Sequence, residues 1–286
     1  MAETHGVATT RRRLRTELRR LREGARLHQA DVVKQLDWSI SKLIRIENGS
    51  VGISVTDLRA LAGVYQADPQ TIEDLVKLAR VTRERQWWSA YRHVLSPSYR
   101  EFIGYEADAA ILMHMHPTLV PGLLQTESYM RAIIPSTTLA PPSTERVEAL
   151  VAIRRKRQEE ILYSSNPPEY TVLLDEAALR RQVGGVAVMA EQLEHLARLS
   201  EKVVHLAVLP FSAGGHPGMQ GAFHIMAFAS EEEESVLFLE TALGNPIQRE
   251  QQEVALYREA FRTMLDRSLR DGDATAFVRS VANDLG

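Results

Sequence analysis

Apolar and polar positions follow two different patterns along the chain. From residue 11 to about residue 80, apolar residues recur at steps of three and four, the spacing of a buried helix face. Beyond residue 100, this spacing alternates with short apolar runs that favour strands, such as YTVLL at residues 170–174. The pattern predicts an all-α N-terminal domain of five helices. It also predicts a C-terminal α+β domain, in which helices pack on a small mixed sheet of about four strands.

The predicted N-terminal domain covers residues 11–80. Residues 1–10 are expected to be a disordered leader, and residues 81–101 a linker helix and loop. Helices are predicted over residues 11–26, 29–36, 39–47 and 54–65, and from 68 toward residue 95. The last one begins at Asp68-Pro69, where an Asp cap precedes a Pro at the first helical position.

The predicted C-terminal domain covers residues 102–286. Helices are predicted over residues 105–116, from Thr126 or Glu127 to a point before Pro135, and over 144–163, 176–183, 187–200, 248–270 and 273–283. Strands are predicted at residues 170–174, 203–209, 223–228 and 236–240. The first two strands are separated by helices and should be parallel, whereas the last two should form an antiparallel hairpin with an acidic tip at 231–234.

Residues 27–49, LHQADVVKQLDWSISKLIRIENG, have the pattern of a helix-turn-helix. Asp37 and Trp38 make the turn, Ser39 caps the second helix, and Asn48-Gly49 end it. The apolar residues that would form a shared core are Val32, Val33, Leu36, Leu43 and Ile46. The outward side of the second helix carries Ile40, Ser41, Lys42 and Arg45. A helix fits the DNA major groove, where short polar groups and Arg contact base edges.

At these residues the chain resembles the XRE family of Cro-like and phage-repressor-like regulators, over about residues 11–80. The matching positions are Arg22, Gln29, Ser41, Arg45 and Glu47. The resemblance implies that Gln29 binds a phosphate and braces the recognition helix, that Arg22 pairs with Glu47, and that Ser41 and Arg45 face bases. The turn departs from the family pattern, because Asp37-Trp38 stands where many members have Gly; Asp tolerates unusual turn geometry.

The second domain resembles the C-terminal domain of actinobacterial XRE-type regulators, over about residues 100–280. The resemblance is carried in order by YEADAAILMHMHPTLVPGLLQTESYMRA, RRKRQEEIL, LLDEAALRRQVGG and VLPFSAGGHPGMQGAFHIMAF. It implies a transcriptional regulator, in some members antitoxin-like and paired with a small acidic partner protein encoded nearby. The domain could bind such a partner, bind a small-molecule effector, or serve dimerisation alone.

Charge is distributed unevenly between the two domains. The whole chain has a net charge of −3, but residues 1–92 hold 17 Lys+Arg against 11 Asp+Glu, and the rest holds 17 against 26. A basic N-terminal part favours phosphate contact, and DNA would repel an acidic remainder. The absence of cysteine excludes disulfides, thiolate metal sites and cysteine nucleophiles. No apolar run approaches the ~18–20 residues of a membrane span, and no signal segment is present, so we expect a cytoplasmic, nucleoid-associated protein.

No pattern of catalytic residues is recognisable. There is no Gly-x-Ser-x-Gly elbow and no phosphate-binding loop. His114 and His116 lie two residues apart on a predicted helix and would point to different faces, so we interpret them, like His205, His216 and His224, as unrelated. Asp175 and Glu176 are expected to cap a helix, and the basic run at 154–157 to be a solvated face. We therefore expect neither an enzyme, nor a metal site, nor a cofactor.

The sequence thus predicts a DNA-binding regulator with defined contacts. Ile40, Ser41 and Arg45 would contact bases, and Gln29, Lys42, Arg11, Arg12 and Arg13 would contact phosphates, although the three N-terminal arginines fit a solvated helix start equally well. The Arg22–Glu47 pair would be structural. Because one helix contacts only a few base pairs, a homodimer on a near-palindromic operator is expected.

Overall fold

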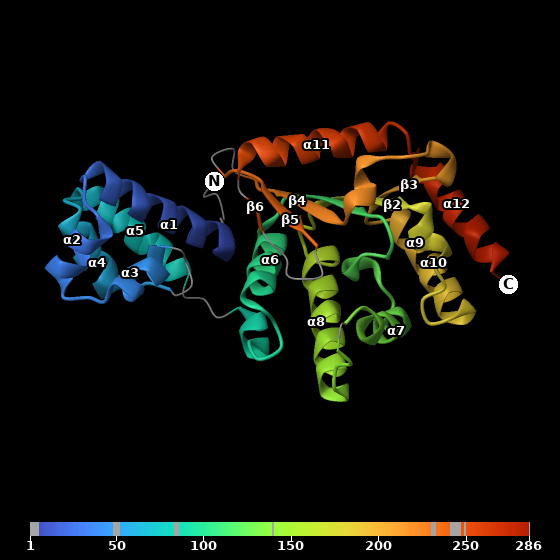
Figure 1. Cartoon of the computed structure of the whole chain (residues 1–286), viewed down its shortest axis with the longest axis horizontal. Helices are drawn as coiled ribbons and strands as arrows, with labels where there is room; N and C mark the ends of the chain where they lie inside the picture. Colours follow the sequence, from blue (N-terminus) through green and yellow to red (C-terminus); the bar gives the residue numbers. More distant parts are fainter. Residues whose placement is uncertain are drawn as a thin grey trace. The chain divides into compact units, whose positions relative to one another are not determined.

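The computed structural model describes residues 6–47, 52–82, 86–138, 140–229, 233–240, 247–248 and 250–285. The chain divides into two compact units, Met1–Ser89 and Ala90–Gly286 (Figure 1). None of the described helices combines the length and apolarity that a membrane crossing requires. The acidic tip expected at 231–234 and the Asn48-Gly49 helix end fall largely or wholly outside the described residues.

The N-terminal unit is built from five α-helices in its described part. They are α1 (Val7–Gly24), α2 (Gln29–Leu36), α3 (Ile40–Glu47), α4 (Val55–Val64) and α5 (Pro69–Val81). Their shared core contains the predicted Val32, Leu43 and Ile46 fully buried, with Val33 and Leu36 partly buried at its edge. Three of the predicted caps are present: Ser39 accepts a hydrogen bond from the Lys42 amide, Ser54 from the Asp57 amide, and Asp68 from the Thr71 amide.

Both ends of the N-terminal unit differ from the prediction. Helix α1 begins at Val7, so residues 7–10 are helical rather than part of a leader, and Thr9 and Thr10 are buried. Helix α5 ends at Val81 instead of continuing toward residue 95, and Trp87–Tyr91 form a separate 3₁₀ helix, η1. The helical spacing of apolar residues continues past Val81, so the pattern alone did not mark this end.

The C-terminal unit contains one mixed sheet of seven strands, not about four. Its strands are β1 (Ile111–His116), β2 (Glu169–Asp175), β3 (His205–Leu209), β4 (Phe223–Ala227), β5 (Val236–Leu239), β6 (Ile247–Gln248) and β7 (Leu269–Arg270). The order is β6-β5-β4-β1-β2-β3-β7. As predicted, β2 and β3 are parallel, and β4 and β5 are antiparallel. The outer strands β6 and β7 have two residues each, too few to produce a sequence pattern.

The central strand β1 replaces part of a predicted helix. Residues 105–116 were expected to be helical, but α6 (Pro97–Asp108) ends at Asp108 and Ile111–His116 pair with β2 in parallel and with β4 in antiparallel. The short run ILMHMH has no clear local preference, and its pairing with two neighbouring strands makes it a strand. On a strand, residues two apart point to the same side, so His114 and His116 share a face of the sheet.

Helices cover both faces of the sheet (Figure 1). Helix α11 (Gln251–Leu265) lies on one face, where its Val254, Phe261 and Met264 pack in one cluster with Met115 of β1. Helices α6, α7 (Glu127–Thr137) and α8 (Thr144–Leu162) lie on the opposite face. The remaining helical elements are α9 (Glu176–Arg180), α10 (Val186–Ser200), α12 (Asp271–Asp284) and the 3₁₀ helices η2 (Gly122–Leu124), η3 (Phe211–Ala213) and η4 (Pro217–Gln220).

Two predicted helix limits in this unit were also wrong. Helix α7 continues through Pro135 to Thr137, although Pro lacks the backbone donor for the helical hydrogen bond. The helix predicted over residues 248–270 is confined to Gln251–Leu265, because the chain on either side joins the sheet as β6 and β7.

A buried ion pair joins α8 to α6. Arg157 Nε and Nη2 each donate to the Glu106 carboxylate over 2.7 Å, and Arg157 Nη1 donates to the Tyr99 hydroxyl over 2.7 Å. The two charged side chains are 5% and 0% exposed. The prediction that residues 154–157 form a solvated face is therefore wrong for Arg157. A charge this deeply buried is tolerated because its partner is bidentate and also buried.

Glu106→Gln should lower the free energy of unfolding of the C-terminal unit by about 3–5 kcal/mol, because it leaves the Arg157 guanidinium buried without a counter-charge. Calorimetry of the full chain measures the effect. Glu201→Gln is the control, since Glu201 pairs with Arg279 over 2.6 Å at the surface and its loss should leave the transition unchanged. Equal melting temperatures for Glu106→Gln and the wild type would show that the pair is not needed.

Candidate functional site

The predicted base-contacting residues lie on one exposed side of α3. Ile40, Ser41 and Arg45 are exposed, while Leu43 and Ile46 face the core. The structure adds Ile44, which is 41% exposed beside Ile40 at 43%. Sequence reasoning missed Ile44, although it lies one helical turn from Ile40 and off the Leu43–Ile46 face. Two exposed isoleucines beside a serine and an arginine form a surface suited to thymine methyl groups and polar base edges.

The end of α3 is held by a buried carboxylate. Arg22 of α1 donates to both Glu47 oxygens over 2.7 and 3.3 Å, and also to the Leu27 carbonyl over 3.0 Å. Gln29 Nε2 of α2 donates to Glu47 over 2.6 Å. The Glu47 side chain is 2% exposed, and its hydrogen bond raises the pKa of Arg22. Three helices therefore meet at one carboxylate, which fixes the orientation of α3.

The turn between α2 and α3 uses an aspartate in a left-handed conformation. Asp37 has φ +53°, and the following Trp38 amide donates to the Val33 carbonyl over 3.0 Å. Ser39 then accepts a hydrogen bond from the Lys42 amide over 3.2 Å, as its predicted role as a cap requires. Asp is one of the few residues other than Gly that adopt this conformation readily. Asp37 therefore makes the turn between α2 and α3 without a glycine.

Several predicted phosphate contacts already have partners within the chain. Lys42 Nζ pairs with Asp57 over 2.8 Å and lies 3.6 Å from the centre of the Trp38 ring. Gln29 is bonded to Glu47, and Arg11 Nη2 donates to the Thr82 carbonyl over 3.3 Å. Arg12 and Arg13 lie near the start of α1, partly buried and exposed respectively, and they too interact within the chain.

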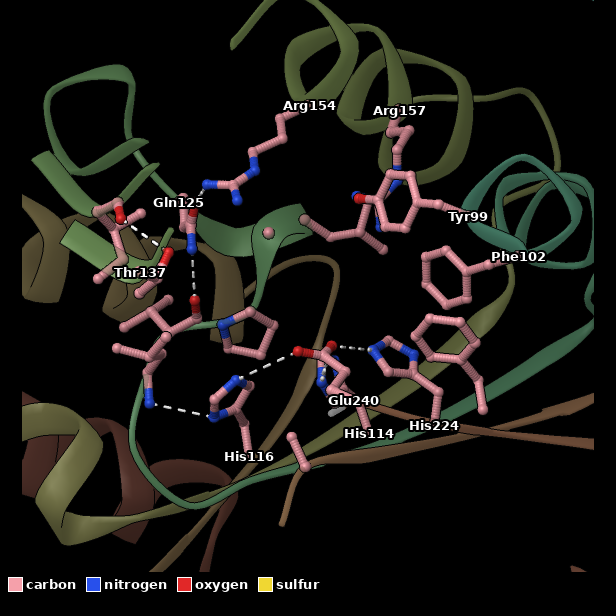
Figure 2. Close-up of a pocket in the computed structure, with 18 of the residues that line it drawn as sticks. Tyr99, Phe102, His114, His116, Gln125, Thr137, Arg154, Arg157, His224 and Glu240 are labelled. Atoms are coloured by element: carbon pink, nitrogen blue, oxygen red, sulfur yellow. Dashed lines mark hydrogen bonds and ion pairs between the residues drawn. The ribbon is translucent and has the colours of Figure 1, made fainter. Parts of the chain in front are cut away.

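The C-terminal unit contains a pocket of about 800 Å³ between the sheet and the helices α6 and α8. Its polar lining includes Tyr99 of α6, His114 and His116 of β1, Gln125, Arg154 and Arg157 of α8, His224 of β4, and Glu240 directly after β5 (Figure 2). Apolar walls are supplied by residues such as Phe102 and Phe238. A concave site of this volume with a few convergent polar groups is typical of small-molecule binding.

Three histidines and a glutamate meet on the sheet side of the pocket. His114 and His224 are opposite each other in the antiparallel pairing of β1 with β4. His114 Nε2 and His224 Nε2 each lie 3.9 Å from Glu240 Oε1, and His116 Nε2 lies 3.7 Å from Glu240 Oε2 (Figure 2). The prediction of unrelated histidines was wrong for these three, because it placed β1 on a helix. In contrast, His205 is exposed on β3.

Burial disfavours the charged form of all three imidazoles in this site. Burial lowers the pKa of His114 and His224 well below the ordinary value, and that of His116 to about 4. His116 Nδ1 accepts hydrogen bonds from the amides of Thr118 and Leu119 over 3.3 and 3.1 Å. Its proton must then be on Nε2, which points toward Glu240. His114, His224 and Glu240 each offer one ligand atom, all within 4.8 Å of one another, so this group could hold a metal ion.

The opposite wall of the pocket is cationic. Arg154 Nη1 donates to Gln125 Oε1 over 2.6 Å, and Gln125 Nε2 donates to the Val120 carbonyl over 2.7 Å. Arg154 is thus oriented by a neutral amide, whereas the charge of Arg157 is compensated by Glu106. Burial lowers the pKa of Arg154, as expected for a charge held away from water. The arrangement favours an anionic group beside Arg154.

Other residues singled out in the sequence have structural roles. Asp175 caps α9 by accepting from the Ala177 amide over 2.7 Å, as predicted, and also lies 2.9 Å from His216 Nε2. Glu176 accepts from the Phe211 amide over 2.7 Å.

Comparison with known proteins agrees with the division into two units. Residues 99–280 match the model of the domain of unknown function DUF5753. The chain belongs to the DUF5753 family. Residues 13–75 match a helix-turn-helix domain, which supports a DNA-binding regulator. No curated protein and no solved structure gives a significant match. The histidines, Glu240 and both pocket arginines all lie within the DUF5753 segment.

Glu47→Gln should lower the free energy of unfolding of the N-terminal unit by about 3 kcal/mol, because it removes the charge that Arg22 and Gln29 share. Amide hydrogen exchange of α3 in the full chain measures it. Glu73→Gln is the matched control, since Glu73 pairs with Arg59 over 2.7 Å on the exposed side of α4 and α5. Equal protection of α3 in both variants would contradict a bracing role for Glu47.

Proposed function

We propose that this DUF5753 protein is a cytoplasmic, nucleoid-associated transcriptional regulator. In this proposal a homodimer binds a near-palindromic operator, and a small molecule in the C-terminal pocket changes its affinity for DNA. DNA binding is supported by the exposed side of α3, which carries Ile40, Ser41 and Arg45. The orientation of this helix is held by the hydrogen bonds of Glu47 with Arg22 and Gln29. This arrangement resembles that of XRE-family regulators.

The DNA contacts divide into two kinds. Ile40, Ser41 and Arg45 would contact base edges in the major groove, with Ile44 as a further apolar contact. Lys42 with Arg12 and Arg13 would contact phosphates, which sets affinity and its salt dependence but carries little sequence information. Lys42 would have to exchange Asp57 for a phosphate, an exchange that is inexpensive for a partly exposed pair.

We expect a dimer because the surface with which one copy would contact DNA is small. A helix of eight residues such as α3 contacts only a few base pairs, and two copies on half-sites about one helical turn apart provide enough contacts for specificity.

The pocket favours a small-molecule effector over a protein partner. A partner protein needs an exposed surface, whereas the converging groups Arg154, Gln125 and Glu240 face the interior of a cavity. We assign this cavity a binding role.

The experiment that tests the regulator is selection of bound duplexes from a random DNA pool by the full-length protein. An enriched near-palindrome is the expected result. Enrichment of a single half-site would contradict the dimer, and no enrichment in any condition, including added effector, would contradict sequence-specific binding.

Arg45→Ala should weaken binding to the selected operator by about 10- to 100-fold, because a bidentate arginine–guanine contact contributes about 1–3 kcal/mol. Binding to non-specific DNA should change much less. Arg59→Ala is the control, since Arg59 is an arginine of the same unit that pairs with Glu73 away from α3. Wild-type operator affinity in the Arg45 variant would show that the recognition face has been misplaced.

Arg154→Gln should weaken binding of an anionic effector by about 10-fold or more, because it removes a charge-assisted hydrogen bond. A panel of small carboxylates and phosphates, screened by the rise in melting temperature of the full-length protein, supplies the ligand. Arg155→Gln is the matched control on the same helix, since Arg155 is exposed and pairs with Glu127 over 3.2 Å. If no compound stabilises the wild type, the partner-protein alternative becomes the better one.

A further inference from the structure

We propose that the pocket of the C-terminal unit holds a divalent first-row transition metal ion, bound by His114, His224 and Glu240. The inference does not depend on DNA binding or on the identity of an effector. It rests on three observations: the geometry of the three side chains, the surroundings of the His114 nitrogen atoms, and the space in front of them.

The geometry is close to that of a three-residue metal site. In a tetrahedral zinc site with bonds of about 2.0–2.1 Å, ligand atoms are ~3.3 Å apart. Here His114 Nε2 and His224 Nε2 are both 3.9 Å from Glu240 Oε1, and the three ligand atoms lie within 4.8 Å of one another. These separations are too long for hydrogen bonds, yet a shift of about half an ångström per ligand would suffice for coordination.

The histidines are fixed and the glutamate is adjustable. His114 and His224 sit opposite each other on two central strands and are 2% and 3% exposed. Glu240 follows the end of β5, and its side chain is 39% exposed. The carboxylate can therefore move toward an ion while the sheet holds the two imidazoles in place.

The nitrogen atoms of His114 have surroundings that suit a metal ligand. Imidazole nitrogen binds zinc, iron, nickel and copper. His114 Nε2 is fully buried and has no hydrogen-bond partner among the described residues. Its other nitrogen lies 3.1 Å from the buried Tyr170 hydroxyl, the kind of second partner that orients a metal-bound histidine. A buried nitrogen without a partner is costly, and an ion would satisfy it.

Neighbouring groups support the same site. The His224 ring stands edge-on to Phe102 at 5.3 Å, which fixes its plane. His116, whose Nε2 carries the proton, lies 3.7 Å from Glu240 Oε2 and can donate to the oxygen that does not face the ion. The carboxylate would then be oriented from outside the coordination sphere, as in other histidine–carboxylate metal sites.

Two histidines and one carboxylate leave at least one coordination position open. All three ligand residues line the pocket of about 800 Å³, which would give exchangeable ligands access to that position. A site with three protein ligands and an open position binds exchangeable ligands, in contrast to a closed structural site. Glu106 offsets part of the charge of the nearby Arg157, which would otherwise oppose a cation more strongly.

The test uses full-length protein without an affinity tag, stripped with a chelator and then titrated with Zn²⁺ in competition with a chromophoric chelator. The expected stoichiometry is one ion per chain at this site. Substitution with Co²⁺ should give the visible absorption of a four- or five-coordinate site.

Glu240→Gln should weaken Zn²⁺ binding by at least about 100-fold, because a lost ligand costs more than the 10- to 100-fold of a lost outer partner. This variant changes an exposed side chain, so circular dichroism should confirm an unchanged fold. His224→Ala should have the same effect on Zn²⁺, whereas His205→Ala, at an exposed histidine of β3, should bind as the wild type does.

Failure of the wild type to bind Zn²⁺ or Co²⁺ at micromolar concentration would overturn the inference. So would wild-type affinity in a folded Glu240→Gln variant. Neither result would affect the operator selection or the effector screen, so a failure here is distinguishable from a failure of the proposed regulator.

Discussion

Pairing of β1 with β2 on one side and with β4 on the other is the constraint on which the C-terminal unit depends. It joins a parallel group of strands to an antiparallel group and makes one sheet of seven. Because residues on a strand alternate between faces, the same pairing sends Met115 to the core under α11 and His114 and His116 to the pocket. Core and pocket are therefore two sides of one strand, and a shift of its register by one residue would exchange them.

Charge is buried in both units in the same manner, at a junction of helices. Glu47 joins α1, α2 and α3 through Arg22 and Gln29, and the Glu106–Arg157 pair joins α6 and α8. In each case the carboxylate receives at least two hydrogen bonds, which offsets the cost of removing it from water. One of these junctions orients α3, and the other holds the wall of the pocket.

The helices of the N-terminal unit could be predicted because their signals are local. Caps at Ser39, Ser54 and Asp68 and the spacing of Val32, Leu43 and Ile46 were all recognisable in the sequence. The pocket could not be predicted, because its residues come from distant segments and depend on β1. A six-residue run of Ile, Leu, Met and His has no clear preference, and only its partners β2 and β4 decide its conformation. A helix at this position predicts that His114 and His116 point to different faces. It gives no reason to bring Arg154 and Arg157 near them, so these arginines were predicted to be solvated.

The position of β1 in the sheet has a consequence for the order in which the chain acquires its structure during synthesis. The N-terminal unit is made of neighbouring helices and can complete its contacts once residues 1–89 have left the ribosome. Ile111–His116, in contrast, emerges early but cannot pair on its second side until Phe223–Ala227 has been translated. During that interval one edge of the apolar strand β1 has no strand partner, while the N-terminal unit has already folded. The nascent chain is thus most exposed to wrong strand pairing in the middle of its synthesis, and chaperones that cover strand edges should act on it then.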